Sequence, residues 1–342
     1  MGICKVMIIE NFIDPYLRKE FGALGAKILS SGNQVMLSLG YPARGLRDSL
    51  QADIQEFLNA SELSLDLRFD SSSLKKSGPL GSVILVASGK GGVGKSTIAA
   101  NIALALKEEG AVVGLLDADI YGPSQGILLG RSGSPKPLVG RDKGIEPVLF
   151  EGLRVMSMSY LSNAATPMVW RGPMASSAVQ QILTQTSWGR LDYLIVDMPP
   201  GTGDIQLTIS QQVQSAGAVI VTTPQDIALL DAKKAIEMFR KVSVPILGIV
   251  ENMSEHVCEK CGHKSYPFSS GGASRLQEEM SVPVLGALPL DLSIRESVDN
   301  GIPSLVADAE SDISKRYREI ARYSAARVWE EKVDSPLITI DD

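Results

Sequence analysis

The sequence predicts an α/β fold with a mostly parallel central sheet flanked by helices, preceded by a small α+β domain. Beyond residue 80, short apolar runs alternate with helical patterns, as expected for parallel strands that are buried on both faces. The first run ends in a glycine-rich loop that leads directly into a helical pattern. Residues 71–79 have the Ser- and Lys-rich composition of a linker and end in Gly-Pro. We therefore divide the 342 residues into a small domain, a linker, a larger domain and a tail, at 1–72, 73–81, 82–330 and 331–342.

The small domain is predicted from short periodic patterns. Residues 34–39 and 63–69 alternate between apolar and polar side chains, as half-buried strands do. Between them, residues 46–58 carry apolar side chains at helical spacing. These segments predict two strands and one helix.

Seven apolar runs predict the strands of the larger domain, at 83–87, 112–116, 153–157, 193–196, 219–222, 246–250 and 284–288. A long helix with one apolar face is predicted at 308–329. Residues 122–150 are rich in Gly and Pro with little periodicity, which leaves a mobile surface loop and an interaction surface equally open. Ligands of such sheets bind at the carboxyl ends of the strands.

The glycine-rich loop fits the pattern G-x-x-x-x-G-K-[ST], and it reads Gly89-Lys90-Gly91-Gly92-Val93-Gly94-Lys95-Ser96-Thr97. Glycines let backbone N–H groups turn toward a phosphate without obstruction by side chains, and the following helix directs its positive end at the same anion. Lys95 would supply a charge for the β and γ phosphates, and the Ser96 hydroxyl would bind Mg²⁺. The loop predicts a nucleotide site. Spacing alone leaves Lys90 as a solvated charge.

Three aspartates follow predicted strands that would flank this loop. Asp117 and Asp119 lie two residues apart after the second strand, so both can reach the same side. We assign Asp119 to orienting or deprotonating the attacking water and Asp117 to holding a Mg²⁺-bound water. Asp197 ends a hydrophobic strand, as in a Walker B motif. The glycines in residues 199–204 would let that loop rearrange when the γ-phosphate leaves.

One cysteine pair, Cys258 and Cys261, has the spacing of a metal-binding or redox motif. One pair cannot complete a four-cysteine site, but two copies related by a two-fold axis could supply four thiolates to one shared cluster. His256 and His263 also make a zinc site conceivable, although their spacing suits one poorly. A shared [4Fe–4S] cluster, zinc, or a thiol pair without metal are the three interpretations.

Composition limits the function classes. The net charge of −6 and the 5% aromatic content argue against nucleic-acid binding. No apolar run approaches the ~18 residues of a membrane span. The first residues lack the layout of a signal peptide, and three cysteines suit a reducing compartment, so we expect a cytoplasmic protein without membrane partners.

The motifs together closely resemble the Mrp/ApbC family of iron–sulfur cluster carrier P-loop ATPases, whose deviant Walker A loop is of the MinD and nitrogenase-iron-protein kind. The segments that carry the resemblance span most of residues 80–325, and they are 89–96, 117–124, 170–174, 197–204, 221–225, 251–254 and the cysteine pair. Residues 13–69 resemble the small domain that often precedes this ATPase. Its loop at 40–45 lacks the cysteine of some relatives, which favours a scaffold or docking role.

The resemblance implies roles for particular residues. Lys90 would reach across a homodimer to the partner's nucleotide, and Asn252 would contact the adenine, with Pro289 and Asp291 in a loop nearby. Cys258 and Cys261 would ligate a [4Fe–4S] cluster that bridges the dimer. ATP with Mg²⁺ would act as a slow switch, and the partners would be apo iron–sulfur recipient proteins and a cluster-assembly scaffold.

Two other functions share parts of this pattern. A positioning or partition ATPase would use the same loop, but it would need a basic face or an amphipathic tail, whereas residues 333–342 are short and acidic. An ordinary NTPase with a structural zinc site would use the cysteines differently.

Overall fold

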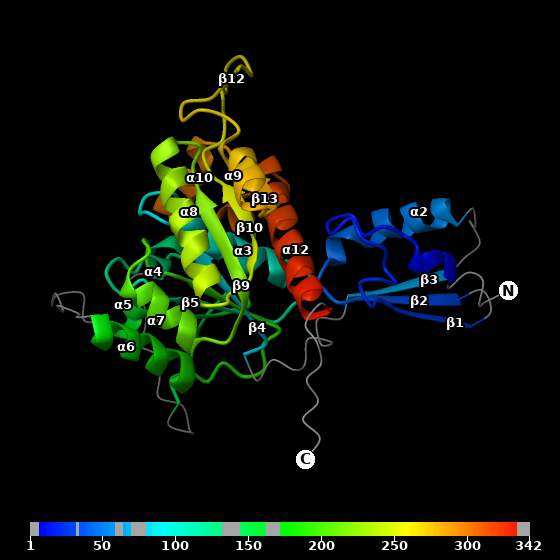
Figure 1. Cartoon of the computed structure of the whole chain (residues 1–342), viewed down its shortest axis with the longest axis horizontal. Coiled ribbons are helices and arrows are strands. Elements are labelled where there is room, and N and C mark those ends of the chain that lie inside the picture. The colour runs from blue at the N-terminus through cyan, green and yellow to red at the C-terminus, as the bar shows by residue number, and fades with distance from the viewer. Residues whose placement is uncertain are drawn as a thin grey trace.

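The computed structural model describes residues 7–31, 34–58, 64–69, 80–131, 144–161 and 172–333. It contains a small sheet near the N-terminus and a large central sheet flanked by helices (Figure 1). The predicted α/β architecture with a preceding α+β unit is therefore confirmed. The boundaries that we place at 73–81 and 331–342 fall largely outside the described residues.

The small sheet has the order β1-β2-β3 and is accompanied by helix α2. The two predicted strands and the predicted helix are confirmed, while β1 was not predicted. Strands β1 and β2 pair antiparallel, and β2 and β3 pair parallel. Helix α2 buries Leu50 and Ile54. The elements are β1 (Lys27–Ser31), β2 (Gln34–Leu39), η1 (Arg44–Leu46), α2 (Arg47–Phe57) and β3 (Ser64–Phe69).

The central sheet has the order β13-β10-β9-β4-β8-β5-β7-β6. All seven predicted strands form, and they pair in parallel. The short β6 is antiparallel and arises in the stretch 122–150, where no strand was predicted. The strands are β4 (Ser82–Ala87), β5 (Val113–Asp117), β6 (Val148–Phe150), β7 (Leu153–Ser157), β8 (Tyr193–Asp197), β9 (Ser215–Thr222), β10 (Ile246–Glu251) and β13 (Val284–Ala287).

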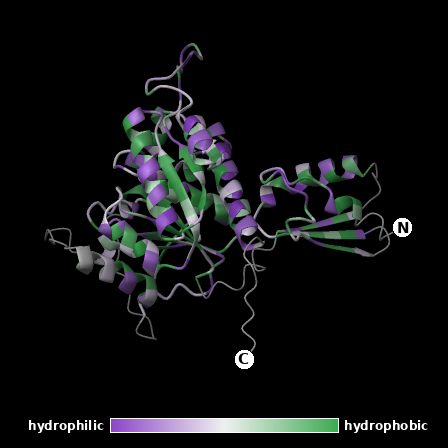
Figure 2. Cartoon of the chain, viewed as in Figure 1, coloured by the Kyte–Doolittle hydropathy of each residue, from purple (hydrophilic) through white to green (hydrophobic). Residues whose placement is uncertain are grey.

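Helices cover both faces of this sheet. Helices α3 and α12 lie together on one face, and α8 and α9 lie on the other (Figure 1). The strands between them are almost entirely apolar, and the helices are polar where they face solvent (Figure 2). The helices are α3 (Lys95–Glu108), α4 (Gln125–Leu128), α5 (Met158–Leu161), α6 (Gly172–Gln185), α7 (Asp204–Gln212), α8 (Asp226–Lys241), α9 (Gly272–Met280), α10 (Leu292–Asp299), α11 (Ser304–Ala307) and α12 (Asp312–Val333).

Two features complete the fold. The predicted final helix exists as α12 but begins four residues later than expected. A hairpin of β11 (His256–Val257) and β12 (Lys264–Ser265) projects beyond the end of the central sheet (Figure 1). None of the helices in the described ranges is both long and apolar enough to cross a bilayer.

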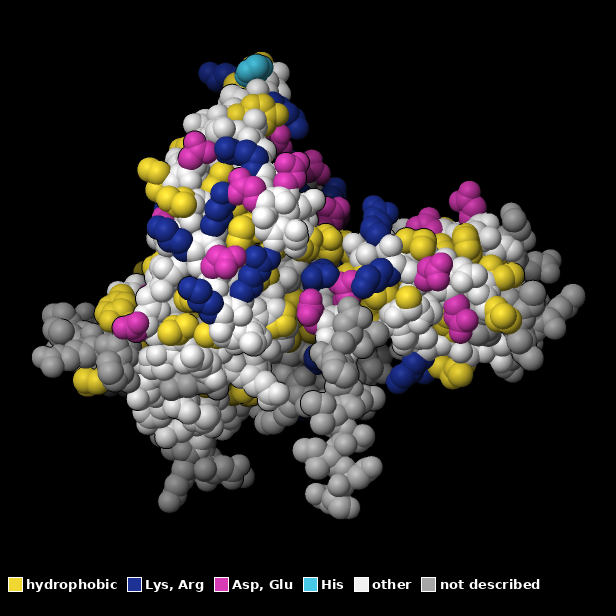
Figure 3. All heavy atoms as spheres, viewed as in Figure 1, with side chains coloured by type: hydrophobic (Ala, Val, Ile, Leu, Met, Phe, Trp, Pro, Cys, Tyr) yellow, Lys and Arg dark blue, Asp and Glu magenta, His cyan; other side chains and the backbone are white. Residues whose placement is uncertain are grey.

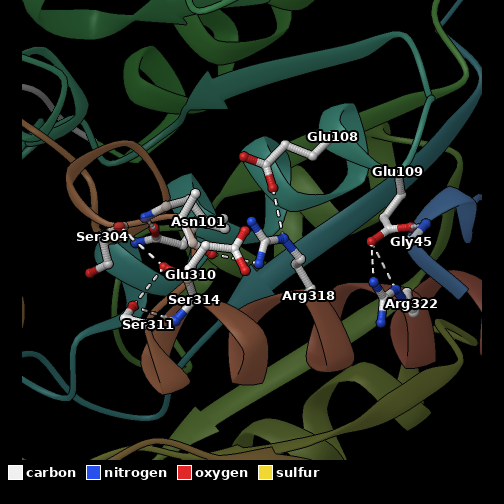
Figure 4. Close-up of polar contacts among 12 residues, drawn as sticks. Gly45, Asn101, Glu108, Glu109, Ser304, Glu310, Ser311, Ser314, Arg318 and Arg322 are labelled. Atoms are coloured by element: carbon white, nitrogen blue, oxygen red, sulfur yellow. Dashed lines mark hydrogen bonds and ion pairs between the residues drawn. The ribbon is translucent and has the colours of Figure 1, made fainter.

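Helix α12 joins the small domain to the central sheet. Tyr41 of the small domain packs against Trp329 with ring centroids 5.7 Å apart. The Arg322 guanidinium donates to Glu109 at the end of α3, and the same carboxylate accepts the Gly45 N–H at 2.7 Å (Figure 4). The small domain is thus docked on α12 by aromatic and ionic contacts.

Candidate functional site

The glycine-rich loop connects β4, the buried central strand, to the first turn of α3. Gly92 and Gly94 have φ angles of +80° and +84°, which side chains tolerate poorly. A Cβ on Gly94 would also lie 2.2 Å from the Asn252 amide nitrogen. The sequence therefore forms here the turn predicted for a phosphate-binding loop, with the helix N-terminus directed at it.

Lys95, at the start of α3, is only 6% exposed. Its ammonium contacts the carboxylate of Asp197 and lies 3.2 Å from the Ser96 hydroxyl oxygen. The other Asp197 oxygen accepts a hydrogen bond from the Gln125 amide at 2.9 Å. Gln125 was not identified in the sequence because no motif marks it, yet it links the buried aspartate to the first turn of α3 through the Ser96 carbonyl.

Asp117 is fully buried beside Asp197, its register partner on the adjacent strand β8. Its carboxylate accepts hydrogen bonds from the Gln125 N–H at 3.0 Å and from the Ser157 hydroxyl at 2.8 Å. Burial, followed by the charge of Asp197, raises the pKa of Asp117 to about 7. The structure thus brings two acidic groups and one lysine together at the strand ends.

Asp119 lies at the edge of a cavity of about 560 Å³, whose other lining residues are Tyr121, Gly122, Pro199, Pro200, Gly203, Asp204, Ile205 and Gln206. Its carboxylate accepts the Gly122 N–H at 3.1 Å, and burial raises its pKa. This cavity places Asp119 opposite the loop predicted to rearrange on phosphate loss.

The two lysines of the glycine-rich loop have different partners. Whereas Lys95 turns inward to Asp197, the ammonium of Lys90 lies 3.3 Å from the side-chain oxygen of Gln225, just before α8. Lys90 is partly exposed. Of these two lysines, only Lys95 belongs to the buried group of charges.

Asn252 follows β10 and lies against the glycine-rich loop. Its side-chain amide donates to the Val93 carbonyl at 2.9 Å, and its backbone N–H donates to Thr222 at 2.8 Å. Pro289 is buried in the loop after β13, and Asp291 caps α10 by accepting the Ser293 N–H at 2.8 Å. Asn252 thus contacts the loop directly, and the segment 288–291 begins beside the end of β10.

Cys258 and Cys261 lie at the turn of the projecting hairpin. The Cys258 N–H donates to the His263 carbonyl at 2.9 Å, and the Gly262 N–H donates to the Cys258 carbonyl at 2.8 Å. Hydrogen bonds from the N–H groups of Lys260 and Cys261, followed by one from the Cys261 thiol, lower the pKa of Cys258. Cys261 is exposed and Cys258 is half-buried. The two thiols are therefore adjacent, accessible and oriented by backbone donors.

The hairpin supplies only these two thiols to a metal. The His256 ring nitrogen lies 3.1 Å from the Leu290 carbonyl oxygen, at the base of the hairpin. Across the described ranges, no three His, Cys, Asp or Glu side chains converge on a point that could hold a metal ion. Both histidines of the chain lie in this projecting segment, which Figure 3 shows at the tip of the molecule. A two-cysteine, two-histidine zinc site within one chain is therefore not formed.

Comparisons with known proteins agree with this geometry. Residues 80–324 match the family described as ParA: NUBPL iron-transfer P-loop NTPase. An iron–sulfur cluster carrier protein of Pseudomonas fragi is 57% identical over 239 residues, which are 70% of this chain and 83% of the relative. A protein of the same name from Haemophilus influenzae is 44% identical over 341 residues, covering 95% of this chain and 92% of the relative.

Solved structures resemble the same region. A nucleotide-binding protein of Archaeoglobus fulgidus, solved in complex with ADP, matches with a TM-score of 0.60 and 38% identity over 72% of this chain and 96% of its own. The cell division ATPase MinD of Pyrococcus furiosus matches with a TM-score of 0.52 and 24% identity over 71% of this chain and 98% of its own, which shows the fold alone. With the family match over 80–324 and these relatives, the chain belongs to the NUBPL iron-transfer family of P-loop NTPases.

Proposed function

We propose that this protein is an ATP-binding and ATP-hydrolysing iron–sulfur cluster carrier. It would hold a [4Fe–4S] cluster as cargo between two copies of the chain and deliver it to apo recipient proteins in the cytoplasm. The single observation that carries the proposal is that a glycine-rich loop with the geometry of a phosphate-binding loop and an accessible pair of thiols lie on the same chain.

The buried charges support nucleotide hydrolysis. The Lys95 ammonium lies at the N-terminus of α3, where β and γ phosphates would bind, and Ser96 would ligate Mg²⁺ there. Asp117 and Asp197 would orient water bound to that ion, and Asp119 would orient the attacking water from the cavity wall. Lys90, whose ammonium lies near the neutral Gln225 amide and forms no buried ion pair with the described residues, would complete the partner's nucleotide site.

The ligand count supports a homodimer. A [4Fe–4S] cluster takes four thiolates. Each described hairpin offers the two thiols of Cys258 and Cys261, so a two-fold pair of hairpins would complete the set. The likeness to MinD concerns the fold alone, so no observation on the described residues favours the positioning or partition function. Relatives named cluster carriers favour the present one.

Anaerobic reconstitution with iron and sulfide tests the proposal. The dimer should bind about four irons and show a broad visible absorption band. Cys258→Ala should abolish both, because it leaves one thiolate on each chain. His263→Ala is the matched control, since the carrier interpretation predicts full iron content whereas a zinc site using that histidine predicts a loss of metal. A Cys258→Ala dimer that retains its cluster would refute the assignment.

A further inference from the structure

The segment that leads to the cysteine hairpin begins at Asn252, whose side chain contacts the glycine-rich loop. Glu251, the last residue of β10, accepts the Ala273 N–H at 2.6 Å and so fixes the start of α9, where the hairpin segment ends. The next residue, Asn252, donates to Val93 in the glycine-rich loop. The hairpin segment is therefore held at both ends by the terminus of β10, and Cys258 lies six residues after Asn252.

The residues between Asn252 and the cysteines, which we call the connecting segment (252–257), are hydrogen-bonded to a second loop. The Ser254 N–H and hydroxyl both donate to the Leu288 carbonyl at 3.0 Å. The Leu290 N–H donates to the Glu255 carbonyl at 2.7 Å. The Leu288 N–H in turn donates to the Glu251 carbonyl at 2.9 Å. The connecting segment is thus fixed by several hydrogen bonds and is not a flexible linker.

The Glu255 carboxylate joins three elements. One oxygen lies 3.0 Å from the Arg316 guanidinium on α12, and the other lies 3.2 Å from the Lys264 ammonium on β12. Arg316 also donates to the Ala287 carbonyl, at the end of β13, at 3.1 Å. The glutamate side chain is 12% exposed, so the surrounding protein restricts its rotamers. Through this carboxylate the hairpin is connected to α12 and to the central sheet.

The backbone of the connecting segment contains one unusual residue. Met253, between Asn252 and Ser254, has a φ of +57°, a conformation that costs free energy for a side chain other than glycine. Such a conformation persists only where neighbouring contacts impose it, and here the contacts of Asn252 and Ser254 do so. The chain therefore leaves β10 in one defined direction.

We propose that the connecting segment transmits the state of the nucleotide loop to the cysteine pair, with Glu255 as the positioning residue. A nucleotide that displaces the backbone of Val93 or Gly94 must displace the Asn252 amide, which contacts both. Residues 254–256 are hydrogen-bonded to neighbouring elements. A displacement of Asn252 is therefore passed to the hairpin, because a flexible linker that could absorb it is not present between residues 252 and 258. This inference rests on the proposed function, because it takes the glycine-rich loop as the nucleotide site and the cysteines as the cargo ligands.

Thiol reactivity of the cluster-free, full-length protein tests the connection without any cluster. We would measure the rate of iodoacetamide alkylation of Cys258 and Cys261, with and without MgADP, by mass spectrometry of the hairpin peptide. MgADP should change the rate by about fivefold, the lower end of measured couplings between sites. In Glu255→Ala the change should fall below about twofold, with the affinity for ADP unaltered.

Two further variants keep the test sharp. Asp299→Ala removes an exposed ion pair with Arg295 on α10 and should leave the nucleotide effect intact. Met253→Gly retains every side-chain contact of Glu255 but frees the backbone, and it should also weaken the effect. It serves as the decisive variant if Glu255→Ala fails to fold.

The outcomes are distinct. A nucleotide effect that is equal in wild type, Glu255→Ala and Met253→Gly would overturn the connection, and so would bound ADP that leaves thiol reactivity unchanged in wild type. Neither result bears on the proposed carrier function, because that function is tested separately by the iron content of the reconstituted dimer. Failure of the wild-type protein to bind MgADP would overturn both.

Discussion

Within the described ranges, Lys95 is the cation that contacts the buried pair of aspartates, Asp117 and Asp197, and it does so through the Asp197 carboxylate. A single lysine cannot neutralise two carboxylates, and the charge of Asp197 adds to the larger effect of burial in raising the pKa of Asp117. Such a group can take up a divalent cation when it loses its proton. Under the proposed function, the excess negative charge of this group would be balanced by Mg²⁺, and Lys95 would be available to phosphate.

We expect Lys95→Ala to lose ATP turnover by at least about 100-fold, because the charge at the phosphates disappears. Iron loading should persist, since Lys95 contacts Asp197 of β8 and Ser96 of α3, both outside the hairpin. ATP hydrolysis and iron content of the same reconstituted sample measure the two properties. If the variant could not be loaded with iron, the nucleotide and cluster sites would be more interdependent than proposed.

Asp117→Asn should change the pH dependence of stability. The folded protein keeps the Asp117 proton up to about pH 7, whereas the unfolded chain releases it near 3.8, so this group destabilises the fold as pH rises between those values. The penalty is at most roughly 4 kcal/mol. The Tm of the variant relative to wild type should therefore increase from pH 4 to pH 8, as measured by scanning calorimetry. A Tm difference that does not vary with pH would contradict the raised pKa.

The glycine-rich loop and the strand β10 act as a unit. Gly94 accommodates the Asn252 amide in the space where other residues carry a Cβ, so the loop and the strand end approach closely. Gly91, by contrast, has open space around it in the direction of a Cβ. The two glycines therefore differ: the packing of the loop requires Gly94, whereas a Cβ at Gly91 would meet no atom of the described residues.

This difference gives a matched pair of variants. Gly94→Ala should destabilise the protein by about 2 kcal/mol and abolish nucleotide binding, because it combines a positive φ with a steric clash. Gly91→Ala should keep the wild-type Tm and still weaken nucleotide binding, because its methyl group enters the space that phosphate needs. Thermal unfolding without MgADP measures the change in stability, and the increase in Tm on adding MgADP measures the change in nucleotide affinity. An unchanged affinity in Gly91→Ala would place the phosphates elsewhere.

The molecule as a whole is connected through two helices. Helix α3 runs from Lys95 at the nucleotide loop to Glu108, and Glu109 follows it. Its C-terminal end meets both α12 and the small domain, where Glu109 holds Arg322 and the Gly45 N–H (Figure 4). Helix α12 also carries Arg316, which holds Glu255 near the hairpin. Two packed helices, α3 and α12, thus contact the small domain, the glycine-rich loop and the segment that leads to the cysteines.

Adjacent glutamates test this architecture. The Glu109–Arg322 pair is buried, with side chains 2% and 10% exposed, whereas Glu108 is 32% exposed in its pair with Arg318. Glu109→Ala should lower the free energy of unfolding by about 3 kcal/mol, because it leaves a buried guanidinium without its partner. Glu108→Ala should cost less than about 1 kcal/mol. Urea unfolding measures both, and equal effects would show that the buried pair does not hold the domains together.

Much of this protein was determined by local sequence pattern. The seven central strands, the glycine-rich loop and the cysteine pair were readable because each depends on the spacing of neighbouring residues. The strand β6 and the hairpin strands β11 and β12 were not predicted, since two or three residues are too few for any periodicity. Strand β1, with Leu29 exposed, also lacks a clean apolar alternation.

Only the tertiary structure decided which charged and polar groups meet. Gln125 bonds to Asp197 from 72 residues away, and Glu109 and Arg322 are 213 residues apart. The pairing of Glu255 with Arg316 is equally hidden in the sequence. A chain of 39 acidic and 33 basic residues offers many possible pairs, and nothing local distinguishes the real ones. The sequence by itself determined the motifs, whereas their connection depends on how the helices pack against the sheet, because packing alone brings distant side chains within bonding distance.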